Sequence, residues 1–446
     1  MPDETATTPA ITPAPTLFTW EFAADPYPAY AWLREHSPVH RTTLPSGVDA
    51  WLVTRYGDAR QALADARLSK NRGHHSEGAN AKNKVGIPGE RGADLMTHLL
   101  NIDPPDHTRL RRLVSKAFTP RRIAEFAPRV QELTDRLIDG LQKDEQGAVK
   151  GEADLIHEFA FPLPIYAICD LLGVPAEDQD DFRDWAGMMI RHGGGPRGGV
   201  ARSVKKMRAY LLELIHRKRA DPGDDLISGL IRASDHGEHL SENEAAAMAF
   251  ILLFAGFETT VNLIGNGMHT LLHHPGQRAQ LQESIARGET DLLETAVEEL
   301  LRYDGPVELA TWRFATESLT IGGQVIGAGD PVLVVLAAAD RDPDRFDGPD
   351  TLDLARRDNQ HVGYGHGIHY CLGAPLARLE AQSALATLLT RLPDLRLAAG
   401  PDELRWRGGL IMRGLRTLPV AFTPESTRTP ESTGIPESTR TPGSAR

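Results

Sequence analysis

Apolar residues recur at three- and four-residue spacing along much of the chain, which is typical of helices with one buried face. This spacing predicts helices in 120–140, 163–172, 202–218, 242–273, 291–303 and 374–391. Alternating apolar and polar residues are confined to short segments. They predict two β-hairpins, one pairing 39–43 with 50–54 and one across 319–327. The pattern therefore predicts a mainly α fold with small β-sheets.

The two ends of the chain differ from the rest in composition. Residues 1–16 are rich in Pro and Thr, and 423–446 repeat a six-residue unit of Pro, Glu, Ser and Thr. Such segments cannot bury enough apolar surface to offset the entropy lost on ordering, so we expect a disordered arm and a disordered tail around one domain at 17–422. Two Gly-rich polar stretches, 71–94 and 191–199, are long enough to be lids over a binding site, and plain surface loops would have the same composition.

Composition and charge exclude several classes of protein. The 446 residues include only two cysteines and carry a net charge of −12. We therefore expect no disulfide framework, no general nucleic-acid binding, and a reducing, cytoplasmic location. The longest uninterrupted apolar run, Met248–Phe257, is far shorter than the roughly 20 residues of a membrane-spanning helix, so we expect no membrane segment. The acidic, proline-containing N-terminus does not have the pattern of a signal peptide.

The strongest candidate for chemistry is the segment 363–373, with the sequence GYGHGIHYCLG. Its glycines permit close approach of the backbone to a flat or tightly bound group. Cys371 lies just before a predicted helix, whose N-terminal dipole favours a thiolate, and a thiolate is a good metal ligand. Two sites fit the residues alone: zinc bound by Cys371 with His361, His366 and His369, or a single thiolate on a haem iron. The zinc alternative lacks the second pair of ligands elsewhere in the chain that structural zinc sites usually have.

The predicted helix 242–273 carries polar residues in an otherwise apolar centre, at Glu258 and Thr259. A buried acid costs free energy unless it is paired. The hydroxyl of Thr259 can bond the carbonyl of Ala255 four residues earlier. These residues are either a satisfied polar pair in a core helix or part of a functional site. The second cysteine, Cys169, lies in an apolar helical stretch, which indicates a buried structural residue.

Taken together, these segments resemble the cytochrome P450 family. The family's haem-binding loop has the pattern Phe-x-x-Gly-x-(His or Arg)-x-Cys-x-Gly, which the chain matches with one departure, Tyr364 for the usual phenylalanine. The family's oxygen-binding helix contains (Ala or Gly)-Gly-x-(Glu or Asp)-Thr, which is matched at 255–259. A third family motif, Glu-x-x-Arg, occurs at Glu299 and Arg302, and a later arginine completes it, for which Arg345 has the expected spacing.

The resemblance implies the triangular helical P450 fold and a haem b cofactor bound through the thiolate of Cys371. It further places these residues around the haem: His107, Arg111, Ala255, Arg313, Tyr364, Gly365, His369 and Gly373. The four basic residues among them would hold the haem propionates. Glu258 and Thr259 would supply protons during oxygen activation. The substrate pocket would be lined from 71–100, 252–255, 306–310 and 411–412.

By the same resemblance the chain is a monooxygenase that inserts one oxygen atom of O2 into a C–H bond or a double bond of a hydrophobic substrate. Its segments look like those of soluble actinobacterial hydroxylases of polyketide and macrolide pathways. No reductase domain is evident, so we expect electrons from a separate ferredoxin and ferredoxin reductase. The alternatives are a haem-thiolate peroxygenase, a haem sensor and a zinc-bound structural loop. The spectrum of the reduced protein with carbon monoxide distinguishes them.

One basic stretch stands out in this acidic chain. Six cations lie within fourteen positions with no acid among them. Arg111 is reserved for the haem by its spacing from His107, which leaves Arg109, Arg112, Lys116, Arg121 and Arg122. Because ferredoxins are generally acidic, this stretch predicts a docking surface that raises the rate of encounter, and a cationic surface that only improves solubility would look the same in sequence.

Overall fold

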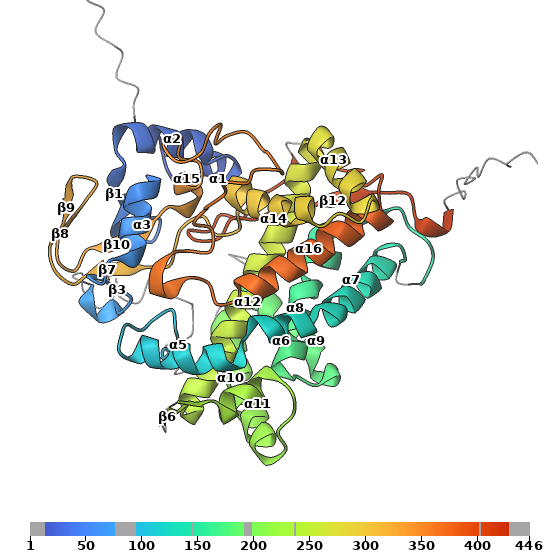
Figure 1. The fold of residues 1–446 in the computed structure, drawn as a ribbon, viewed down its shortest axis with the longest axis horizontal. Helices are drawn as coiled ribbons and strands as arrows, with labels where there is room; N and C mark the ends of the chain where they lie inside the picture. Colours follow the sequence, from blue (N-terminus) through green and yellow to red (C-terminus); the bar gives the residue numbers. More distant parts are fainter. Residues whose placement is uncertain are drawn as a thin grey trace, which may run out of the picture.

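The structure is a computed structural model that describes residues 14–75, 95–144, 146–190, 199–235, 238–400 and 403–427. Most of the predicted arm and tail, and most of both predicted loops, lie outside these ranges and stay predictions. Within the described part the chain is mainly helical with small sheets, as the hydrophobic pattern predicts. Figure 1 shows the largest sheet gathered at one side of the molecule and most of the helices at the other.

The helices follow the predicted segments closely. In the first half of the chain they are α1 (Trp20–Ala24), α2 (Tyr27–His36), α3 (Tyr56–Ala64), α5 (Asp106–Ala117), α6 (Pro120–Glu125), α7 (Ala127–Leu141), α8 (Pro162–Leu172), α9 (Gln179–Ile190) and α10 (Gly199–Ala220). In the second half they are α11 (Leu226–Arg232), α12 (Glu242–His273), α13 (Pro275–Ala286), α14 (Asp291–Asp304), α15 (Leu336–Ala339) and α16 (Ala374–Arg391). The predicted segment 120–140 forms two helices, because Pro128 in the first turn of α7 has no N–H to continue α6.

Short strands form one larger sheet and several small ones. They are β1 (Val39–Thr43), β2 (Asp49–Val53), β3 (Leu68–Ser69), β4 (Glu152–Asp154), β5 (Ser234–Asp235), β6 (Glu238–His239), β7 (Arg313–Ala315), β8 (Leu319–Ile321), β9 (Gln324–Ile326), β10 (Pro331–Val334), β11 (Arg396–Leu397) and β12 (Pro419–Ala421). The larger sheet has the order β1-β2-β10-β7-β3, in which only β2 and β10 run parallel. The hairpins β1–β2 and β8–β9 are the two predicted ones.

Helix α12 runs through the middle of the molecule and packs against α8, α10, α14 and α16 (Figure 1). It has the bounds that its periodicity predicts, and its first turn is closed by a capping box of Ser241 and Glu244. By length and composition α12 could cross a membrane, although the uninterrupted apolar run within it is short. Most of its apolar window, 72%, is buried by the rest of the protein, as expected for a core helix.

The folded part of the chain continues slightly beyond the predicted boundary at residue 422. The backbone and hydroxyl of Thr423 donate hydrogen bonds to the carboxylate of Asp394, and Glu425 forms an ion pair with Arg391. Residues 423–427 are therefore attached to the domain by polar contacts, which a composition argument based on apolar burial cannot detect.

Candidate active site

The cysteine loop is held by its own backbone and by its neighbours. The N–H of Cys371 donates to the carbonyl of Tyr364 over 2.9 Å. Gly365 and Gly367 have φ values of 77° and 74°, in the left-handed region that favours glycine. At Gly367 a side chain would also approach the carbonyl of Leu63 to 3.1 Å. Helix α16 begins directly after the loop, as predicted, with Pro375 in its first turn. The glycines thus permit a tight loop that presents one thiol.

The thiol of Cys371 is exposed, whereas its backbone is bonded within the fold. Protein groups surround the sulfur closely enough that desolvation raises the pKa of the thiol above its ordinary value. The N–H groups of Gly373 and Ala374 and the charge of Arg111 oppose this increase without cancelling it. The N-terminus of α16 thus favours the thiolate, as the sequence predicts, but desolvation of the sulfur outweighs this effect. A bound metal ion deprotonates a coordinating thiol outright, so metal binding and not the helix would create the thiolate.

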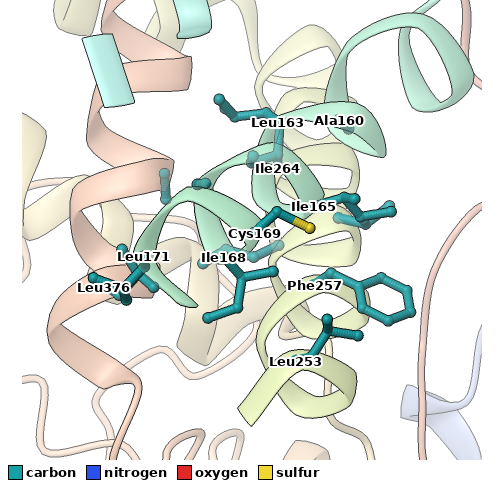
Figure 2. Packing of buried hydrophobic residues seen from close by; sticks show 14 of the residues in the cluster. Ala160, Leu163, Ile165, Ile168, Cys169, Leu171, Leu253, Phe257, Ile264 and Leu376 are labelled. Atoms are coloured by element: carbon teal, nitrogen blue, oxygen red, sulfur yellow. The ribbon is translucent and has the colours of Figure 1, made fainter. Parts of the chain in front are cut away.

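The other cysteine has a purely structural environment. Figure 2 shows Cys169 on α8 among apolar side chains that include Ile165, Leu253 and Phe257. Its side chain is fully buried, and this burial raises the pKa of its thiol. The prediction that Cys169 is a buried structural residue is confirmed.

The polar centre of α12 faces a large cavity. Ala255, Glu258 and Thr259 all line a cavity of about 970 Å³. The hydroxyl of Thr259 donates to the carbonyl of Ala255 over 2.8 Å, as the sequence predicts, and the helix remains continuous there. Glu258 is only 6% exposed. The acid and the alcohol thus share one wall of the cavity, and each of the four predicted lining segments contributes residues to that cavity.

Buried basic groups gather where the resemblance places a carboxylate-bearing ligand. The rings of His107 and His369 lie 4.3 Å apart, and Arg313 is 3% exposed. Burial and the neighbouring cations lower the pKa of His369 to about 2. Burial lowers the pKa of Arg313 to about 10, and the attraction of Asp103 offsets only part of this. His369 is therefore neutral at pH 7, whereas the buried Arg313 keeps its positive charge.

Lys70 completes this cluster and could not be recognised in the sequence. It is 2% exposed, and its ammonium donates to carbonyl oxygens of Thr311 and Trp312. Burial and the charge of Arg313 lower its pKa well below the ordinary value. No motif marks Lys70, because β3 and β7 bring it to the cluster across some 240 residues. The carboxylate of Asp103 accepts a hydrogen bond from the backbone N–H of Lys70. Asp103 was easier to find in the sequence than Lys70, because Asp103 begins the segment that contains His107.

The Glu-x-x-Arg motif forms a fully buried ion pair. The guanidinium of Arg302 lies 2.7 Å from Glu299, and both side chains are 0% exposed. The third member is Arg356, at 3.1 Å from Glu299. The prediction of Arg345 is wrong, because that residue pairs with Asp358 at the surface. The loop after α15 turns back onto α14, so the arginine that reaches Glu299 lies eleven positions later than spacing suggested.

Tyr364 keeps the aromatic packing expected of phenylalanine at this position. The guanidinium of Arg378 lies 4.5 Å from the centre of its ring, and Glu298 holds that guanidinium at 2.6 Å. His361 bonds the same carboxylate at 3.0 Å, which removes it from the set of zinc ligands considered above. Among the described residues no group of three or more potential ligands could hold a metal ion. Within the same residues, the hydroxyl of Tyr364 has no hydrogen-bond partner.

Comparison with known proteins decides the family. The sequence profile described as Cytochrome P450 matches residues 196–393. Cytochrome P450 107B1 of Saccharopolyspora erythraea is 49% identical over 404 residues, which cover 90% of this chain and 95% of that protein. The chain belongs to the cytochrome P450 family.

Two further relatives agree with this assignment. The 6-deoxyerythronolide B hydroxylase of Saccharopolyspora erythraea is 41% identical over 416 residues, covering 92% of this chain and 99% of that protein. Among solved structures, cytochrome P450 PksS of the bacillaene polyketide synthase of Bacillus subtilis superposes with a TM-score of 0.81 at 38% identity, covering 91% of this chain and 99% of that one. The chain thus has the P450 fold and is a haem-thiolate monooxygenase.

The residues present fit the haem of a cytochrome P450. The exposed thiol of Cys371 would bind the haem iron through its sulfur. The buried side chains of Lys70 and Arg313 suit the two propionates, and the Nε2 atom of the 2%-exposed His107 has no hydrogen-bond partner among the described residues. Arg111 lies beside His107 and donates to the carbonyl of Tyr370 over 2.9 Å. Gly373 lies next to the sulfur, and a Cβ atom there would be in van der Waals contact with it at 3.8 Å.

A further acid near the polar centre of this P450 was missed in the sequence. Glu380 on α16 is 1% exposed and faces Thr260 on α12. Burial raises its pKa to about 8, so it is largely neutral at pH 7. A single glutamate in an otherwise ordinary core helix does not indicate a functional residue in the sequence. Only the packing of α16 on α12 shows that Glu380 is buried beside Thr260.

Proposed function

We propose that this cytochrome P450 oxidises a hydrophobic secondary metabolite of the polyketide or macrolide class, by hydroxylation of a C–H bond or epoxidation of a double bond. The observation that carries the proposal is the cavity of about 970 Å³ beside Glu258 and Thr259. Its walls are largely apolar, with a few charged groups, as in sites that bind sizeable apolar ligands. The names of the relatives, a 6-deoxyerythronolide B hydroxylase and a polyketide synthase P450, point to the same substrate class.

In this proposal the haem, when bound, supplies reductive dioxygen activation and oxygen transfer. The chain's own residues hold it: Cys371 through sulfur, and His107, Arg111, Arg313, His369 and Lys70 through the propionates. Ala255, Tyr364, Gly365 and Gly373 would contact its faces and edges. The hydroxyl of Thr259, fixed by the Ala255 carbonyl, and the buried carboxyl of Glu258 would move protons into the cavity. The enclosing apolar walls would exclude bulk water.

Electrons would come from an acidic ferredoxin and its reductase in the cytoplasm. The cations of the proposed docking surface lie on α5 and α6, and three of them pair with acids of this chain. Arg109 pairs with Glu244, Arg121 with Glu125 and Arg122 with Asp224. Arg112 and Lys116 are exposed on α5, and they are the cations we assign to docking.

A spectral screen tests the proposed substrate class. Polyketides and macrolides of the host, added to the ferric holoenzyme, should displace water from the site and shift the haem absorption band at micromolar concentrations. Incubation of each hit with ferredoxin, reductase and O2 should then yield a product heavier by one oxygen atom. If only unrelated compounds, such as simple fatty acids, bind and are oxidised, the proposed class is wrong.

A further inference from the structure

A charged residue on the wall of the cavity has no role in the site as described so far. Arg407, in the loop between α16 and β12, lines the same cavity as Glu258. One of its terminal nitrogens, Nη1, is buried and has no hydrogen-bond partner among the described residues. A buried guanidinium nitrogen without a partner is costly, so it needs an anion or a polar ligand within the cavity.

The backbone of Arg407 is fixed relative to α12. Its N–H donates to the carbonyl of Gly414 over 2.8 Å, and its Nε donates to Leu415 over 3.2 Å. Gly414 in turn lies directly against Asn262, since any side chain at 414 would clash with that carboxamide. Asn262 is one helical turn beyond Glu258 and lies on the same face of α12. The loop is therefore held against the helix next to the acid.

Charge complements this geometry. Burial lowers the pKa of Arg407, and the attraction of Glu258 is the largest effect that opposes it. Arg416 and Asp154 act on Arg407 more weakly and with opposite signs. Arg407 and Glu258 are thus the two opposite charges that face each other at this part of the cavity.

Two other charged residues that line this cavity, Arg413 and Glu308, have partners of their own. Arg413 pairs with Asp304 at 2.6 Å. The carboxyl of Glu308 accepts the hydroxyl of Tyr30. Glu380 approaches α12 from α16 and faces Thr260.

We infer that Arg407 is a positioning residue for Glu258: it keeps the carboxylate ionised and directed along the cavity wall, so that Glu258 can pass protons at neutral pH. This inference rests on the proposed role of Glu258. It differs from that role because it assigns the control of the acid to a loop some 150 residues away in the sequence.

Dioxygen itself can serve as the probe, so the test needs no organic substrate. Holoenzyme reduced through ferredoxin and its reductase converts O2 with two electrons and two protons to hydrogen peroxide, or with four of each to two molecules of water. Poor proton supply favours peroxide. The measurement is the fraction of consumed O2 that is released as peroxide between pH 5.5 and about 9. This range includes the pH values near which catalytic acids and bases usually titrate.

Arg407→Gln should raise the peroxide fraction several-fold at pH 7 and move the midpoint of its pH dependence upward by about one unit, the order of effect of a neighbouring opposite charge on a carboxyl. Arg407→Lys, which keeps the charge, should restore most of the wild-type profile. Arg405→Gln removes an exposed arginine of the same loop that does not line the cavity, and should leave the profile unchanged. Each variant is first checked for the thiolate-type carbonyl spectrum, which shows that the fold and haem are intact.

The double variant decides between the interpretations. If Arg407 acts through Glu258, adding Arg407→Gln to Glu258→Gln should change nothing further. A full additional effect in that background, or a wild-type profile for Arg407→Gln alone, overturns the inference while leaving the role of Glu258 intact. A wild-type profile for Glu258→Gln alone overturns both the inference and the proposed proton path.

Discussion

The cysteine loop and the cavity are built in different ways. The loop, 361–378, is closed by backbone hydrogen bonds of its own. It is supported by the segment 298–302 and by Arg356, through buried or partly buried ion pairs. The cavity is lined from the N-terminal helix, the β1–β2 turn, α9, α12 and two later loops. A local, polar scaffold holds the metal ligand, whereas side chains from distant segments shape the space for the substrate. The chemistry can therefore stay constant while the substrate specificity changes.

The largest expected effect is at the metal ligand. Cys371→His should abolish the thiolate-type spectrum of the reduced carbon monoxide complex, because no other described residue offers a thiolate to the site. Cys169→Ser, which changes a cysteine in the apolar core, should keep that spectrum in the fraction that folds. The assignment of the ligand is falsified if the Cys371 variant keeps the spectrum.

The next effect concerns the rigidity of the loop's support. Glu299→Gln removes the carboxylate shared by Arg302 and Arg356 and leaves buried positive charge, so the free energy of unfolding should fall by about 3–5 kcal/mol. Asp358→Asn breaks the exposed pair with Arg345 and should cost less than about 1 kcal/mol. Urea denaturation of the holoenzyme measures both. If both variants lose the same free energy of unfolding, the buried ion pair stabilises the fold no more than the surface pair does, which contradicts this prediction.

Thr259 tests the cavity side of the comparison. Thr259→Ala should leave haem incorporation and substrate affinity unchanged, while about tenfold more reducing equivalents are lost as peroxide, at the lower end of general acid–base effects. Thr295→Ala removes the same kind of hydroxyl-to-carbonyl bond at a half-buried position of α14 that does not line the cavity, and should have no such effect. Product formed per reducing equivalent is the measurement. Unchanged coupling in the Thr259 variant would remove the hydroxyl from the proton path.

The stability of the protein at acidic pH should depend on Glu298, which supports the cysteine loop. Burial tends to raise the pKa of Glu298, but hydrogen bonds from Arg378 and His361 prevail and lower it to about 2. Because the folded value lies below the unfolded one, this carboxylate stabilises the protein above pH 4.5, and the gain is lost as the pH falls from there towards 2. Glu298→Gln should remove roughly 2 kcal/mol at pH 7 and flatten this part of the stability curve. If the free energy of unfolding of the Glu298→Gln variant falls as steeply between pH 4.5 and 2 as that of the wild type, this role of Glu298 is wrong.

The smallest effect is expected at the outer surface. Reversing charge at Arg112 and Lys116 should slow electron transfer from ferredoxin about tenfold at low ionic strength, with less effect at high salt. Substrate affinity should not change. The same reversals at Lys205 and Lys206, exposed on α10, are the matched control. If stopped-flow reduction is equally fast in the α5 variant and the wild type, docking occurs elsewhere.

Local sequence was sufficient for the elements and for the residues that motifs contain. The 3.6-residue periodicity placed α12 and α16, the glycine pattern placed the Cys371 loop, and polar residues in an apolar helix marked Glu258 and Thr259. Each of these signals lies within a few helical turns of chain. Its physical cause, one buried face or one constrained backbone angle, is equally local.

Only the tertiary structure decided which distant residues complete the site. Arg356 rather than Arg345 reaches Glu299, and Lys70, Glu380 and Arg407 are ordinary charged residues until strand pairing, helix packing or a loop buries them. A charged group needs a partner once it is buried, because an unpaired buried charge costs free energy. Burial in turn depends on contacts between segments that lie tens to hundreds of residues apart. The sequence determined the thiolate, the acid and the alcohol, whereas the packing of the whole chain determined their partners and the shape of the cavity.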